Sequence, residues 1–115
     1  MVESVMIDAV RYTVEETIEV ILVDGQACRG SVDYNQATIK LSVDTENMGD
    51  GRKPQTLMHE VIHALLYERG RYEDGDNEEL VDTLASGVIN LIRQNPELVD
   101  LIQERQNKQE RKIGQ

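Results

Sequence analysis

The fold of this chain is decided by one stretch, Thr56-Leu57-Met58-His59-Glu60-Val61-Ile62-His63-Ala64-Leu65-Leu66. Its apolar residues recur at intervals of three and four, the spacing typical of one face of an amphipathic helix. Pro54 suits the first turn of a helix, and Gly70 supplies a stop signal. The pattern therefore predicts a helix over residues 54–69.

The two histidines of the chain, His59 and His63, stand four residues apart in this predicted helix. At about 3.6 residues per turn, both imidazoles project from the same face. Two imidazoles in this arrangement can hold one zinc ion, which lowers the pKa of a bound water to about 7. Glu60, beside His59, is placed to take a proton from that water as a general base. This HExxH pattern arises by chance in a chain of this size with a probability on the order of 1%.

A catalytic zinc ion needs a third protein ligand and an open fourth position. Cys28 is one candidate, although a lone cysteine with apolar neighbours is more typical of a core. Glu78 and Glu79, at the start of the second predicted helix, are better candidates. Glu78 shares a face with Asp82 and Ala85 beside the apolar stripe, whereas Glu79 shares a face with polar residues. Helix phase favours Glu78 as the third ligand and leaves Glu79 as an alternative.

The layout of HExxH, a short loop and then Asn77-Glu78-x-x-x-Asp82 resembles the gluzincin metallopeptidases. The resemblance implies that His59, His63 and Glu78 bind zinc, that Glu60 is catalytic, and that Asp82 supports the first histidine. The small size and the preceding strands are similar to ImmA/IrrE-type metallo-endopeptidases of phage or Gram-positive bacterial type. The resemblance covers residues 27–95, although the run 84–89 departs from the ImmA/IrrE signature.

The resemblance also implies an activity, zinc-dependent hydrolysis of a peptide or protein substrate. A peptidase needs a group that stabilises the oxyanion, and the hydroxyls of Tyr67 and Tyr72 are candidates. In zincins the strand before the active helix often pairs with extended substrate, which here would be residues 38–43. A narrow regulatory target is expected rather than bulk digestion.

Residues 9–43 carry the composition and alternation of strands, with segments expected at 9–14, 18–23, 27–33 and 38–43. The connection at 34–37 fits a hairpin. Gly30, inside the third segment, indicates a bulge or a close backbone approach. The expected fold is α+β and zincin-like, with a small N-terminal sheet packed on the active-site helix and two further helices.

The two further helices are expected at residues 78–94 and from Pro96 onward. Asn77 or Asp76 would cap the first of them, and Asn95 would cap the second. After Ile102 the chain has no apolar stripe, so residues 104–115 are expected to form a polar tail that frays. Residues 1–103 are then a single domain.

The formal net charge of -10 and the pI near 4.5 disfavour nucleic acid and anionic membranes as partners. The single cysteine allows no internal disulfide, and no apolar run is long enough for a membrane span. A cytoplasmic protein is expected.

Three other interpretations of the histidine pair stay open. The zinc site can be structural or inactive in an interaction protein of phage or bacterial origin. The histidines can be ordinary surface residues of a helix, or the acidic surface can act as a cation buffer. The substrate and the oligomeric state are not determined by the sequence.

Overall fold

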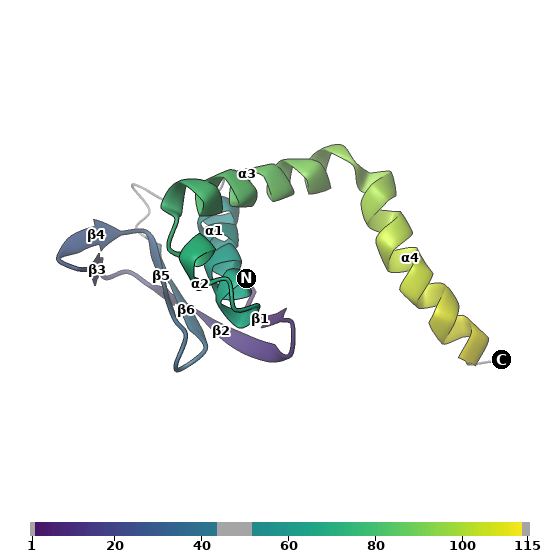
Figure 1. Cartoon of the computed structure of the whole chain (residues 1–115), viewed down its shortest axis with the longest axis horizontal. Coiled ribbons are helices and arrows are strands. Elements are labelled where there is room, and N and C mark those ends of the chain that lie inside the picture. The colour runs from purple at the N-terminus through teal and green to yellow at the C-terminus, as the bar shows by residue number, and fades with distance from the viewer. Residues whose placement is uncertain (1, 44–51, 114–115) are drawn as a thin grey trace.

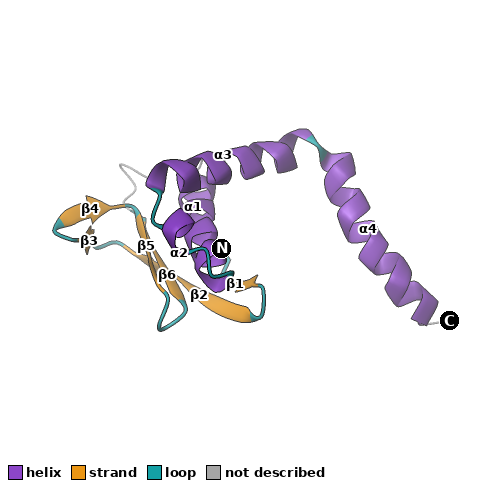
Figure 2. Ribbon diagram, viewed as in Figure 1, coloured by secondary structure: helices purple, strands orange, loops and turns teal. Residues whose placement is uncertain are grey.

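The computed structural model describes residues 2–43 and 52–113, with side chains as far as residue 104. The strands come first and the helices follow (Figure 2), which confirms the α+β class. The strands are β1 (Ser4–Ile7), β2 (Val10–Thr17), β3 (Ile21–Val23), β4 (Gln26–Cys28), β5 (Gly30–Asp33) and β6 (Thr38–Ser42). The helices are α1 (Arg52–Glu68), α2 (Tyr72–Gly75), α3 (Glu78–Gln94) and α4 (Pro96–Ile113).

Four of the strands form a mixed sheet in the order β1-β2-β6-β5, and β3 pairs with β4 as a separate hairpin. β2 and β6 are parallel, whereas β1 and β5 each run antiparallel to their neighbour. The prediction that residues 38–43 form an edge strand for substrate is wrong, because β6 has β2 on one side and β5 on the other. After β2 the chain leaves the sheet to form the β3–β4 hairpin. It then returns as β5, on the side of β6 that faces away from β2. Within the described residues, β5 and β1 are therefore the two edge strands of this sheet.

The main core lies between the sheet and α1. Alternation along β6 buries Ile39 and Leu41 and leaves Lys40 exposed, as expected for a strand with one covered face. These residues pack with Tyr12 of β2 and Ala64 of α1. Each fully buried large apolar side chain contributes about 1.5–3 kcal/mol relative to an exposed one. The apolar pattern that predicted the α1 helix therefore also fixes the side of α1 that faces the sheet.

A second, smaller core holds α3 against the other side of α1. Ile62 of α1 packs against Val81 and Ala85 of α3. The side chain of Asn77 accepts a hydrogen bond from the backbone N–H of Leu80 at 3.1 Å, so the predicted cap of α3 is confirmed. Because α1 is packed on both sides, its position is fixed relative to both the sheet and the start of α3.

The structure differs from the sequence prediction in several segments, and β1 was not among the expected strands. The expected strand 18–23 is regular only over β3, and the expected strand 27–33 breaks at Arg29 into β4 and β5. The break lets β4 turn away with β3 while β5 pairs with β6. The expected loop after α1 contains the short helix α2, and the expected connector 44–53 lies largely outside the described residues.

The tail that was expected to fray after Ile102 is helical, because α4 continues to Ile113. Its sequence is rich in Gln, Glu, Arg and Lys, which are good helix formers even without an apolar stripe. The side chain of Asn95 donates to the backbone carbonyl of Leu91 at 3.0 Å, so it closes the end of α3. None of the helices in the described part of the chain has the length and apolar content to cross a membrane.

A matched pair of leucine substitutions tests the position of the core. Leu41 is 0% exposed and Leu22 is 66% exposed. Leu41→Ala is expected to lower the free energy of unfolding by about 2–5 kcal/mol, because it leaves a cavity against α1. Leu22→Ala is expected to change it by less than about 0.5 kcal/mol. Urea unfolding followed by circular dichroism measures both, and similar losses in the two variants would contradict this core.

Candidate metal centre

The two histidines converge on one point in front of α1. Their Nε2 atoms are 3.2 Å apart, and their rings meet edge to face at 68°. His63 is buried and His59 is partly exposed. The spacing of four residues on a helix that is packed on both sides produces this arrangement, so the predicted pairing of His59 and His63 on one face is confirmed.

The first residue of α3 brings a carboxylate to the same point. One oxygen of Glu78 is 2.9 Å from Nε2 of His59, and the other is 3.0 Å from Nε2 of His63. Glu79 does not line the cleft that contains the histidines. The prediction from helix phase that Glu78 faces α1 is therefore confirmed by the position of its side chain.

The Nδ1 atoms of the two histidines also have partners. The carbonyl oxygen of Gly75, at the end of α2, lies 2.7 Å from Nδ1 of His63. A carbonyl can only accept, so this nitrogen carries the proton, and in the neutral ring Nε2 presents a lone pair. Asp82 lies one turn after Glu78, with its oxygen 3.5 Å from Nδ1 of His59. Asp82 is thus near His59, and its support of that histidine stays a prediction, whereas the contact with Gly75 was not predicted.

The Nε2 atoms of both histidines and the carboxylate of Glu78 therefore face one another within 2.9–3.2 Å. The Nε2 lone pair of His63 points toward the carboxylate of Glu78, and this contact is repulsive unless a cation or a proton lies between the atoms. A tetrahedral zinc ion with ligands at about 2.0–2.1 Å places two nitrogens about 3.3 Å apart. The separation of 3.2 Å between the two Nε2 atoms fits such an ion.

Glu60 also lies beside this point, and its side chain is buried. It is 7% exposed, and burial raises the pKa of its carboxyl to about 7, with a further upward contribution from Glu78 and a downward one from His63. Its ligand atom lies within 4.8 Å of those of His59 and His63. A carboxyl that is close to the metal position and has a pKa near neutrality is suited to exchange a proton.

Gly30 of β5 explains how the sheet approaches Glu60. A Cβ at this position would lie 3.1 Å from Cγ of Glu60 and 3.1 Å from Cγ2 of Thr56. Of the two predictions for this glycine, close backbone approach is therefore the one that the structure confirms. Because Gly30 has no side chain, β5 can lie directly against the face of α1 that carries Glu60.

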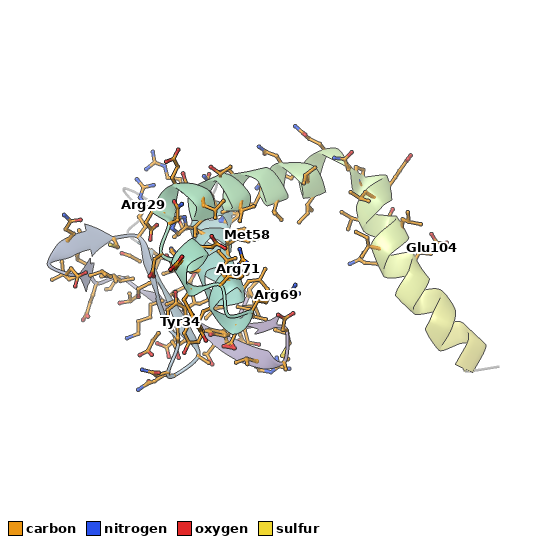
Figure 3. The ribbon with its side chains drawn as sticks, in the orientation of Figure 1. Arg29, Tyr34, Met58, Arg69, Arg71 and Glu104 are labelled. Carbon is orange, nitrogen blue, oxygen red and sulfur yellow. The ribbon has the colours of Figure 1, made fainter. Side chains whose placement is uncertain are left out.

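The metal position opens into a cleft of about 930 Å³. Its walls come from the β3–β4 hairpin, β5, α1 and the segment that joins α2 to α3. Arg29 and Tyr34 flank β5 (Figure 3), and both line the cleft. Cys28 also lines the cleft, but its sulfur contacts the backbone carbonyl of Gln26 at 3.6 Å, whereas the oxygens of Glu78 lie 2.9 Å and 3.0 Å from the two histidines. Among the described residues, Glu78 is thus better placed than Cys28 as a third ligand.

The tyrosines are arranged differently from the expectation. Tyr67 and Tyr72 do not line the cleft, whereas Tyr34 does. Tyr67 stacks on Tyr34 with ring centroids 4.2 Å apart and also contacts Tyr72 edge to face. Burial raises the pKa of Tyr34, with further contributions led by Glu60, so its hydroxyl is a hydrogen-bond donor at neutral pH. No local sequence pattern singles out Tyr34 beyond its hairpin position, because only the pairing of β5 with β6 brings it to α1.

Zinc binding to two alanine variants tests the ligand assignment. Glu78→Ala is expected to weaken zinc binding by at least about 100-fold, because it removes both oxygens from the histidine pair. Glu79→Ala removes the neighbouring carboxylate of the same helix turn and is expected to leave the affinity within about threefold. Isothermal titration calorimetry of the two variants and the wild type measures this difference. Equal losses in both variants would reject Glu78 as a ligand.

Comparison of the chain with models of protein families, with curated proteins and with solved structures finds no match. The chemistry of the site is therefore inferred from its residues and their geometry.

Proposed function

We propose that this chain is a zinc-dependent metallopeptidase that hydrolyses a peptide or protein substrate. The observation that carries the proposal is the convergence of His59, His63 and Glu78, whose facing atoms lie 2.9–3.2 Å apart. The resemblance of the sequence to gluzincins supports the same ligand set. Support also comes from the partners of the two Nδ1 atoms, since metal-bound histidines usually donate their second N–H to a carbonyl or carboxylate.

In this mechanism the two Nε2 atoms and the carboxylate of Glu78 would hold the metal. A zinc ion bound there would supply a water whose pKa is lowered to about 7. The carboxylate of Glu60 would accept a proton from the attacking water and return it to the nitrogen of the leaving amine. Burial between α1 and β5 keeps the pKa of Glu60 close to the range that both transfers require.

The shape of the cleft favours an extended peptide as substrate. β5 is an edge strand among the described elements and lines the cleft beside Glu60. Backbone N–H and C=O groups of such an edge can pair with an added strand, as in β-augmentation. The hydroxyl of Tyr34 lies on the same wall and is the group we assign to the developing oxyanion.

A single substitution separates catalysis from metal binding. Glu60→Gln keeps the size of the side chain but removes the base, so the variant is expected to bind zinc as the wild type does. Its hydrolysis of a peptide library is expected to fall by about 10²–10⁴-fold. Zinc content measured by mass spectrometry and cleavage measured on the same samples give both readouts. The variant Glu79→Gln serves as the control.

Two outcomes of this experiment contradict the proposal. If the zinc-loaded wild type and Glu60→Gln are equally inactive on a broad library, the chain is a zinc-binding interaction protein and not a peptidase. If Glu60→Gln cleaves as fast as the wild type, Glu60 is not the general base.

A pair of tyrosine variants tests the oxyanion assignment. Tyr34→Phe is expected to lower kcat by about 10²–10³-fold while zinc affinity stays unchanged, because only the hydroxyl is lost. Tyr67→Phe keeps the stacked ring and loses a hydroxyl outside the cleft, so its kcat is expected to stay within about threefold. Steady-state kinetics of both variants measures the contrast. Equal effects would show that the tyrosine stack, and not the Tyr34 hydroxyl, matters.

A further inference from the structure

The side chain of Arg29 lines the cleft and has no acidic partner in the part of the chain that the structure describes. It is exposed, at the point where β4 ends and β5 begins. Arg69 and Arg71, by contrast, each pair with an aspartate, at 3.0 Å and 2.7 Å. In a chain of formal net charge -10, an arginine without a carboxylate beside it is available to the carboxylate of a ligand.

The position of Arg29 along the cleft follows from the packing of β5 on α1. Gly30, at the start of β5, abuts Glu60 of α1. Tyr34, which follows β5, stacks on Tyr67 near the end of α1. β5 and α1 therefore run in the same direction, and Figure 3 shows Arg29 and Tyr34 at opposite ends of β5. Because Arg29 precedes Gly30, it enters the cleft on one side of Glu60 only, toward the N-terminal end of α1.

Acidic side chains of the cleft gather around the metal centre and Tyr34. Glu78 and Asp82 lie 2.9 Å and 3.5 Å from nitrogens of His59. Asp76 lies close enough to Tyr34 to add to the effect of burial in raising the pKa of its hydroxyl. The cleft is therefore acidic from the metal centre toward the Tyr34 end of β5.

The end of the cleft that contains Arg29 has the opposite character among the described residues. Arg52, the first residue of α1, also lines the cleft, and the first turn of α1 has no acidic side chain. Asp24 lines the cleft too, but from the tip of the β3–β4 hairpin, which lies beyond this end of β5 (Figure 1). β4 separates Asp24 from Arg29 by about 10 Å, which exceeds the Debye length of about 8 Å at physiological ionic strength. A peptide that crosses the metal centre thus meets positive charge on one side of it.

A guanidinium is well suited to a carboxylate, because its planar array of N–H groups can donate two parallel hydrogen bonds to the two oxygens. An extended peptide advances about 3.3 Å per residue. Arg29 directly precedes the glycine that abuts Glu60, so its guanidinium is within reach of side chains roughly one to three residues from the bond that Glu60 serves.

We propose that Arg29 is a specificity-determining residue that binds the carboxylate of an Asp or Glu side chain of the substrate, on one side of the scissile bond. The preferred substrate is then a peptide segment with an acidic residue close to the cleaved bond. The inference rests on the proposed function in treating this peptide as a substrate. Binding of the carboxylate itself requires no hydrolysis, so the two proposals can fail separately.

Peptide binding to the zinc-loaded Glu60→Gln variant tests Arg29 without hydrolysis. The probes are pools of fluorescein-labelled peptides that are random in uncharged residues and carry either Glu or Gln at the central position. Fluorescence anisotropy is expected to show about 3–10-fold tighter binding of the Glu pool. Adding Arg29→Ala is expected to make the two affinities equal, and Arg29→Glu is expected to favour a third pool with a central Lys. Arg11→Ala is the matched control, because Arg11 is exposed on β2 and does not line the cleft, and it is expected to keep the preference for Glu.

A Glu pool that binds no tighter than the Gln pool overturns the proposal. A preference for Glu that survives Arg29→Ala also overturns it, because the zinc ion and not Arg29 would then hold the carboxylate. Circular dichroism and zinc content check that each variant keeps its fold and its metal, and Arg29→Gln replaces Arg29→Ala if the latter loses helix content.

Cleavage of the same pools by the zinc-loaded wild type separates this inference from the proposed function. If no peptide is cleaved but the Glu pool binds through Arg29, the proposed activity fails and the carboxylate site stands. If peptides are cleaved, mass spectrometry of the products is expected to place Glu on one side of the cleaved bond. Equal enrichment of Glu on both sides would contradict the position assigned to Arg29.

Discussion

The contact of one carboxylate with two imidazoles is the interaction on which the site depends. Glu78 reaches Nε2 of both His59 and His63, and the opposite nitrogen of His63 is committed to the carbonyl of Gly75. A cation or a proton among these atoms relieves the repulsion between the carboxylate of Glu78 and the Nε2 lone pair of His63. The fold supplies the rigidity that this arrangement needs, because α1 is packed on one side by the sheet and on the other by α3.

The parts of the site that were predicted from the sequence are those fixed by local geometry. The pairing of His59 with His63 follows from helix periodicity, and the choice of Glu78 follows from the phase of α3. The contributions of Gly75 and Tyr34 depend on where α2 and β5 lie relative to α1, which no local pattern specifies. The edge strand was assigned wrongly for the same reason, because the crossover that places β5 outside β6 is a property of the whole sheet.

Residues 1–87 contain eighteen acidic and seven basic side chains, and the candidate metal centre lies among them. An acidic surface attracts cations. Under the proposed function the first residue of α3 is a metal ligand, so the packing of α3 on α1 through Val81 and Ala85 also holds that ligand in place.

X-ray absorption spectroscopy of the zinc-loaded protein tests the central claim most directly, because it reports the identity and distance of the atoms around the metal. The account predicts one zinc per chain with only nitrogen and oxygen neighbours at about 2.0–2.1 Å, two of them imidazoles, and a water at the open position. A sulfur neighbour at about 2.3 Å would place Cys28 in the site and contradict the ligand set. Four protein ligands with no water would contradict a catalytic centre.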